Sequence, residues 1–94
     1  MALFMLACFD KPNSLDLRMA TREAHLAYAR DHAAMIKIAE PMLDEAEAMA
    51  GSMFILEAPD RAAVEAFNAA DPYQIAGLFG QVEIRGYRVS IGQL

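Results

Sequence analysis

The chain opens with a run of apolar residues, from Ala2 to Phe9, that stops at the turn-forming segment Asp10 to Ser14. A run of this length between such boundaries is typical of a β-strand buried on both faces. Because side chains alternate along a strand, one face would carry Leu3, Met5, Ala7 and Phe9, and the other Phe4, Leu6 and Cys8. A strand that is apolar on both sides needs a covering layer on each side, and this requirement constrains the fold of the whole chain.

The spacing of apolar residues changes after this strand to the helical period of about 3.6 residues. It predicts a helix from Leu15 to about Ala33, with Ser14 or Asn13 as its N-cap. The residues expected on the buried stripe of this helix are Leu15, Met19, Leu26, Ala29 and Ala33.

Two further strands and a helix are predicted in the middle of the chain. The second strand covers Met35–Ala39 and ends near Pro41, and the third covers Ser52–Ala58. The segment 44–50 between them fits either a short helical turn or a loop. A second helix then runs from Asp60, its expected N-cap, to about Ala70, with Val64 and Phe67 facing inward.

The chain is expected to finish with a short helix and a long strand. Asp71-Pro72 is a favourable helix start and predicts a short helix to about Phe79. Alternation from Val82 to Ile91 predicts the last strand, with Gly86 at a bulge or a close approach.

The predicted order of elements is β-α-β-β-α-β, which is the α+β, ferredoxin-like arrangement. Residues 1–94 would form one domain, with an antiparallel sheet and both helices on one of its faces. The opposite face would be bare, although its strands are apolar and the chain is 56% hydrophobic. We therefore expect a homodimer in which two open sheet faces pack together as an α+β barrel.

Charge and cysteine content exclude several classes of partner. The net charge of −5 argues against nucleic acid and against an anionic membrane surface. No apolar stretch is long enough for a membrane-spanning helix, and the N-terminus lacks the basic region of a signal peptide. The single cysteine, Cys8, rules out an intramolecular disulfide, so we expect a cytoplasmic protein.

His25 is the first candidate for chemistry. It lies on the shoulder of the apolar stripe of the first helix, and Arg18 and Arg22 precede it on the same side. A histidine near cations could act as a base toward an anionic small molecule that the arginines bind. The alternative is a half-buried histidine on the solvated flank of an amphipathic helix.

Asp71 is the second candidate, although a helix N-cap explains it equally well. The two roles are compatible, because a carboxylate can accept a backbone N–H on one oxygen and an imidazole N–H on the other. In that case Asp71 would orient His25 and stabilise its protonated form. Tyr73, in the same short helix, could line a binding pocket or simply pack.

The other reactive side chains point to no further site. Cys8 lies in an apolar strand and is expected to be an inert thiol, and His32 is expected near the end of the first helix, where the helix dipole favours a cation. Two histidines seven residues apart do not make a metal site. We expect neither a metal nor a cofactor.

Several motifs together resemble the YciI-like (YCII-related) family of small bacterial proteins. They are Arg22-x-x-His25-Leu26, Pro41-Met42, Ala70-Asp71-Pro72-Tyr73, Ala76-Gly77, Val82-Glu83-Ile84 and Tyr87. The resemblance implies a dimeric α+β barrel whose cleft holds a histidine and an aspartate as an acid–base pair, here His25 and Asp71. Glu40 departs from the family pattern, which has glycine there, and its carboxylate could enter the cleft or point outward.

Three functions are consistent with these features. The first is a cofactor-independent lyase or isomerase that acts on a small organic molecule through His25 and Asp71, with Arg22, Arg18 and Tyr73 binding the substrate. The second is a non-catalytic module that binds a small ligand in the same cleft. The third is an oxygenase of the similarly shaped dimeric barrels, which often handle haem or aromatic polyketides. It is the weakest of the three, because the chain has no tryptophan and only its two histidines could ligate haem.

Overall fold

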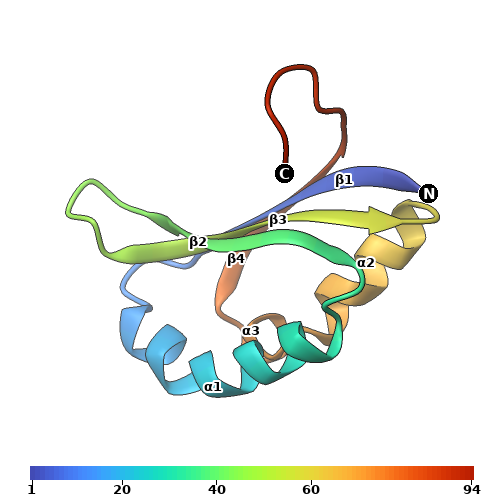
Figure 1. Cartoon of the computed structure of the whole chain (residues 1–94). Helices are drawn as coiled ribbons and strands as arrows, with labels where there is room; N and C mark the ends of the chain where they lie inside the picture. Colours follow the sequence, from blue (N-terminus) through green and yellow to red (C-terminus); the bar gives the residue numbers. More distant parts are fainter.

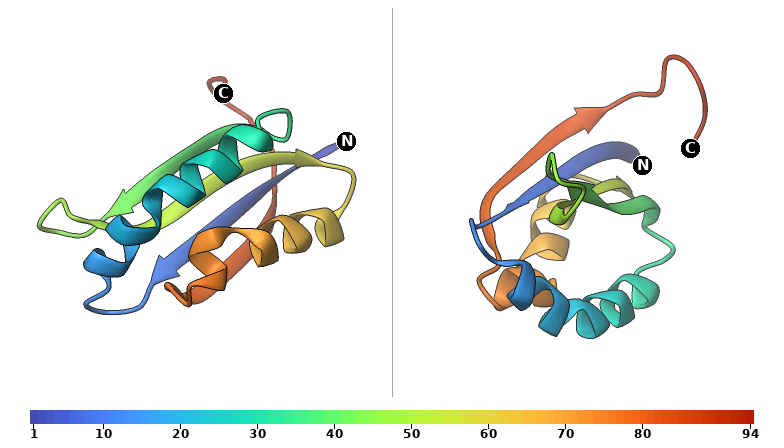
Figure 2. Two further views of the ribbon diagram at one scale, coloured as in Figure 1. Left: turned by 90° about the horizontal axis from the view of Figure 1, so that it is seen from below. Right: turned by 90° about the vertical axis from the view of Figure 1, so that its left-hand side faces the viewer.

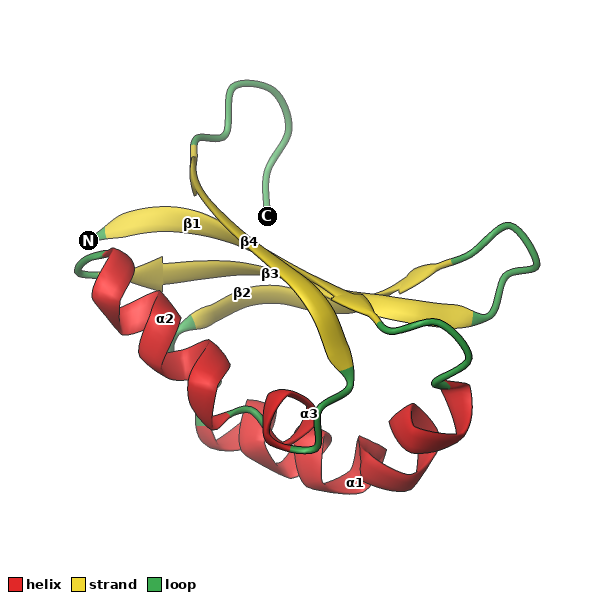
Figure 3. Ribbon diagram, turned by 180° about the vertical axis from the view of Figure 1, so that it is seen from behind, coloured by secondary structure: helices red, strands yellow, loops and turns green.

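A computed structural model describes all 94 residues of the chain. Its elements are β1 (Ala2–Asp10), α1 (Leu15–Asp31), β2 (Ile36–Leu43), β3 (Met49–Ala58), α2 (Arg61–Ala70), α3 (Pro72–Ile75) and β4 (Phe79–Tyr87). The four strands form one antiparallel sheet in the order β2-β3-β1-β4, and all helices lie on one face of it (Figures 1 and 3). This is the predicted ferredoxin-like β-α-β-β-α-β arrangement. None of the helices is long and apolar enough to cross a membrane.

The helices divide the sheet between them. In Figure 2, where the sheet is seen from the helix side, α1 lies over β2 and β3, and α2 lies over β1 and β4 and also contacts β3. The core fills the space between sheet and helices, and its fully buried large side chains are Leu6, Phe54, Leu56, Val64, Tyr73 and Leu78. The inward positions of Val64 and Phe67 were predicted correctly.

The boundaries of several elements differ from the predictions. Segment 44–48 takes the loop rather than the helical turn of the two predicted alternatives, and β3 begins at Met49 instead of Ser52. The loop is held by Asp44, whose Oδ1 accepts from the backbone N–H groups of Ala46 and Ala48. The short helix α3 ends already at Ile75, and β4 covers Phe79–Tyr87 instead of Val82–Ile91. No bulge occurs at Gly86, which pairs in register with Phe4; the irregularity lies at Phe9 and Asp10.

Ser14 occupies the N-cap position of α1 but makes no capping hydrogen bond. Its hydroxyl donates to the Pro12 carbonyl instead, at 3.3 Å. The predicted cap of α2 is confirmed, since Asp60 Oδ1 accepts from the Ala63 N–H at 2.9 Å.

The predicted buried stripe of α1 is wrong. Leu15 and Met19 are 43% and 50% exposed, whereas Arg18 and His25 are the buried residues of this helix. The helix is rotated so that polar side chains face the sheet. This orientation is stable because each of the two polar groups finds a hydrogen-bond partner outside the helix, which compensates for its lost hydration.

The sheet face opposite the helices is uncovered. Leu3, Met5, Ala7 and Phe9 of β1 point to it, together with Met53 and Ile55, their partners on β3. Charged side chains share this face, including Glu40, Glu57, Glu83 and Arg85. Phe9 is 39% exposed there, so apolar surface is left in water.

Candidate active site

The structure brings His25 of α1 and Asp71 together, although they are 46 residues apart in the chain. His25 Nδ1 lies 3.0 Å from Asp71 Oδ1, and both side chains are buried. Asp71 also caps α3, because the same Oδ1 accepts from the Tyr73 backbone N–H at 2.9 Å. Capping and contact with the imidazole therefore coexist at one oxygen. The expected division between the two oxygens is wrong, since both contacts use Oδ1 and Oδ2 is buried without a hydrogen-bond partner.

The imidazole of His25 is held by aromatic rings as well as by the carboxylate. Tyr73 stacks on it with a centroid distance of 4.1 Å and an interplanar angle of 17°. Phe54 presents an edge to it at 6.0 Å. With Nδ1 directed at Asp71, the opposite ring nitrogen, Nε2, is the one available to a bound molecule.

Arg18 is a buried residue of the pocket wall, and its guanidinium is held by hydrogen bonds within the protein. Only 2% of it is exposed, and its guanidinium donates to both oxygens of Asp10, at 2.7 and 2.9 Å, and to Ser52 Oγ at 2.9 Å. It also lies 4.5 Å from the centroid of the Tyr73 ring. Burial disfavours its charge, but hydrogen bonding and attraction to Asp10 outweigh burial and raise the pKa of Arg18.

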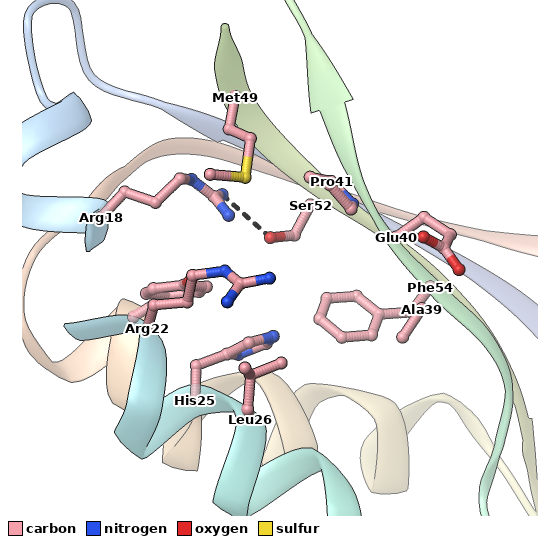
Figure 4. A pocket seen from close by; sticks show the side chains of 11 residues that line it. Arg18, Arg22, His25, Leu26, Ala39, Glu40, Pro41, Met49, Ser52 and Phe54 are labelled. Carbon is pink, nitrogen blue, oxygen red and sulfur yellow. Dashed lines mark hydrogen bonds between the residues drawn. The ribbon is translucent and has the colours of Figure 1, made fainter. Parts of the chain in front are cut away.

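Arg22 differs from Arg18 in its surroundings. It is exposed and forms no ion pair within the chain, and Figure 4 shows it pointing into the pocket together with His25. Since Asp10 neutralises Arg18, Arg22 is the cation that remains available to an anionic ligand.

The pocket above His25 has a volume of about 60 Å³. Its lining residues are Arg18, Arg22, His25, Leu26, Ala39, Glu40, Pro41, Met49, Ser52, Phe54 and Tyr73. Figure 4 shows Glu40 at the margin of the pocket with its carboxylate turned away from His25. Glu40 thus takes the outward of the two predicted orientations.

Tyr73 supplies the pocket with a protonated phenol. Burial raises its pKa, and the opposing charges of Arg18 and Arg22 do not cancel that effect. The hydroxyl is therefore a hydrogen-bond donor at neutral pH rather than an anion.

Sequence reasoning missed Ser52 and Asp10 as site residues. Ser52 Oγ accepts from Arg18 and lines the pocket, so its own hydroxyl hydrogen can be donated to a ligand. The available signal was a polar residue at the start of the predicted apolar strand 52–58, but the orientation of Ser52 toward the helices depends on the pairing of β3 with its neighbours.

His32 lies apart from this site. It follows the last turn of α1, and its Nδ1 lies 2.8 Å from the Tyr28 carbonyl oxygen. Nowhere in the chain do three or more His, Cys, Asp or Glu side chains gather in a way that could hold a metal ion.

Cys8 is buried in the hydrophobic core, and its thiol lies 3.6 Å from Asn68 Oδ1. Burial, reinforced by the nearby charge of Asp71, raises its pKa to about 12.

At pH 8 only about one molecule in ten thousand would carry the reactive Cys8 thiolate. We expect no labelling of folded protein by iodoacetamide at this pH and complete labelling in urea, as measured by mass spectrometry; rapid labelling of the folded chain would contradict the buried thiol.

These features define a class: small α+β proteins of ferredoxin-like topology in which a histidine and a carboxylate meet beneath a pocket between a helix and the sheet. The chain belongs to the YCII-related domain family, which matches residues 2–88. The predicted family membership is thereby confirmed.

Two kinds of relative support this assignment. Protein YciI of Escherichia coli and of Shigella flexneri are each 30% identical to the chain, over 92% of its length and 96% of theirs. The solved 5-chloro-2-hydroxyhydroquinone dehydrochlorinase TftG of Burkholderia phenoliruptrix AC1100, in complex with 2,5-dihydroxybenzoquinone, is 32% identical with a TM-score of 0.87, over 94% of this chain and 95% of that one.

More distant structures share the fold alone. An antibiotic biosynthesis monooxygenase superposes with a TM-score of 0.58 over 97% of this chain and 100% of its own, but it is only 18% identical.

Proposed function

We propose that this protein is a cofactor-independent acid–base enzyme of the lyase or isomerase type that acts on a small organic molecule. The observation that carries the proposal is the 3.0 Å contact between His25 Nδ1 and Asp71 Oδ1, which leaves Nε2 for the substrate. An imidazole held in one orientation by a buried carboxylate is suited to remove a proton near neutral pH.

The roles of the surrounding residues follow from their positions. Nε2 of His25 takes a proton from an acidic O–H or C–H group, and Asp71 stabilises the imidazolium that forms. The electron pair left on the substrate then expels a leaving group, or it moves so that the proton returns at another atom. Arg22 binds the substrate's negative oxygen, with the Ser52 and Tyr73 hydroxyls as further donors.

The similarity to TftG supports a substrate of the phenol class. That protein is a dehydrochlorinase, and elimination of hydrogen chloride is a proton removal coupled to loss of an anionic leaving group. We propose 5-chloro-2-hydroxyhydroquinone as the first compound to test with this chain.

The proposed pair makes a prediction about the tautomer of His25. A carboxylate acceptor requires the hydrogen on Nδ1, so neutral His25 should hold a single tautomer in the wild type and a mixture in Asp71→Ala. Long-range ¹H–¹⁵N NMR spectra at pH 8, where an ordinary histidine is neutral, would report this. His32 is the internal control, because its Nδ1 is directed at the Tyr28 carbonyl and should not respond. Identical His25 spectra in the two proteins would contradict the pair.

A second candidate is a binding module that holds the same ligand without converting it. The observation in its favour is that no activated nucleophile lines the pocket: Cys8 is buried outside the lining, and the Ser52 hydroxyl accepts from the Arg18 guanidinium and contacts no base. Saturable binding of phenolic acids with no turnover of any of them would favour this reading.

We also propose a cytoplasmic homodimer in which the uncovered sheet faces of two chains pack together. The free cysteine suits a reducing compartment, and the apolar residues of β1 on the uncovered face supply the interface.

Phe9→Asp should weaken this dimer, because it replaces an exposed apolar side chain of the uncovered face with a charge that the interface would have to desolvate. Light scattering at micromolar concentration should show twice the 10.3 kDa chain mass for the wild type and a shift toward 10.3 kDa for the variant. Leu17→Asp is the matched control, since Leu17 is a similarly exposed apolar residue on α1. A monomeric wild type would overturn the proposed dimer.

A further inference from the structure

The pocket above His25 is too small for the substrate that the proposed function requires. Its volume is about 60 Å³, whereas a cavity of about 150 Å³ is known to take up a single benzene molecule. Arg22, Phe54 and Tyr73 surround the imidazole closely, so only the reacting edge of a ring-sized molecule can lie there. The rest of the molecule must occupy other space.

A larger hollow of about 420 Å³ adjoins this pocket. It lies between α1 and the edge strand β2, and we call it the α1–β2 groove. Its apolar lining consists of Leu26, Ala29, Ala33, Ile36, Ile38 and Ala39. Leu26, Ala39 and Glu40 line both hollows, so the groove continues the pocket.

The chemistry of the groove selects an uncharged, apolar occupant. Six of its nine lining residues are hydrophobic, and its charged members, Arg30, Lys37 and Glu40, are exposed. Lys37 is partly neutralised by Glu57, 3.5 Å away on β3. Arg22 lies on the pocket side and favours an anionic group there, whereas the two cations that line the groove, Arg30 and Lys37, are exposed to water.

We infer that the α1–β2 groove is a subsite for the apolar part of an amphiphilic substrate, such as a phenol or hydroxyquinone bearing an alkyl substituent. The ionisable end lies at His25 and Arg22, and the hydrocarbon part lies along Ala29 and Ala33. This inference rests on the proposed function for the position of the ionisable end.

The test compares the binding of 2,5-dihydroxybenzoquinone with that of its 3-propyl and 3-hexyl derivatives. The protein is the full wild-type chain, in the oligomeric state that it adopts in solution. Titration calorimetry should show the dissociation constant falling by about threefold to fourfold for each methylene group that enters the groove. Methyl NMR spectra should show the hexyl derivative shifting the signals of Ala29 and Ala33 and leaving that of Ala27 unmoved.

Ala29→Phe fills the groove and should abolish the gain in affinity that the chain provides. Ala27→Phe is the matched control, because Ala27 is exposed on α1 and lines no hollow, and it should keep that gain. If Ala29→Phe does not fold, the shifts of the Ala29 and Ala33 methyl signals in the wild-type protein still test the inference.

The possible failures are distinguishable. If the parent quinone binds at His25 but the chain adds no affinity, the groove subsite is overturned and the proposed function stands. If the alkyl chain adds affinity equally in Ala29→Phe and Ala27→Phe, the chain lies elsewhere and the inference is likewise overturned. If none of the three compounds binds, both the subsite and the proposed substrate class fail.

Discussion

Replacing His25 with alanine is expected to lower kcat/KM by about 10²–10⁴-fold, because the variant loses the group that transfers the proton. The buried Asp71 would then face a cavity instead of an imidazole, but it would keep its bond to the Tyr73 N–H. The local helix start should therefore survive the substitution. Steady-state rates of chloride release from 5-chloro-2-hydroxyhydroquinone, with unfolding temperature as a check on folding, would measure the effect.

The chain offers a matched control for this substitution. His32 is the other histidine, it follows the same helix, and its ring also contacts a tyrosine, Tyr28. It lines no part of the pocket above His25. His32→Ala should leave kcat/KM within about twofold of the wild type. Full activity in His25→Ala would end the acid–base proposal.

Asp71→Asn separates orientation from charge at the same site. The amide oxygen can accept the two bonds that Oδ1 now accepts, so the imidazole can keep its orientation while the negative charge is lost. We expect kcat to fall, because the imidazolium formed in the reaction is no longer stabilised. A variant as active as the wild type would leave Asp71 as a helix cap only.

Replacing Arg18 with methionine is expected to destabilise the fold by about 3–5 kcal/mol, since it leaves Asp10 buried without its cation. The Asp10 side chain is only 5% exposed, so water cannot replace the two hydrogen bonds that it loses. Ser52 loses a donor at the same time, and Tyr73 loses the guanidinium beside its ring. Urea unfolding followed by circular dichroism would measure the change.

Two companion variants show whether burial causes this loss. Lys37→Met breaks an ion pair with Glu57 whose members are about 40% exposed, and it should cost no more than about 1 kcal/mol. Asp10→Asn combined with Arg18→Met should be less destabilised than Arg18→Met alone, because no unpaired charge is left inside the protein. Equal losses for Lys37→Met and Arg18→Met would contradict the buried pair.

Local signals in the sequence predicted the elements and their order well. The apolar run of β1, the Asp60 cap and the Asp71-Pro72 helix start all depend on neighbours within a few residues. Errors occurred at element ends, such as the end of β4, where strand pairing decides how far the extended conformation continues.

The face of α1 that is buried could not be predicted in this way. The apolar spacing of Leu15 and Met19 indicates one face, but the structure buries Arg18 and His25 instead. Whether a polar group can be buried depends on whether a partner meets it, and the partners here are Asp10, Ser52 and Asp71.

The sequence by itself determined the types and order of the elements, the topology that they permit, and the residues available for chemistry, because these depend on local propensity and on periodicity. Only the tertiary structure decided that His25 meets Asp71 and that the pocket continues into the α1–β2 groove. It also decided that Arg18 is buried in an ion pair with Asp10, whereas Arg22 forms no ion pair. These relations range from contacts between neighbouring elements to the contact of His25 with Asp71, which spans 46 residues. They are set by helix rotation and strand register, which no local pattern of residues specifies.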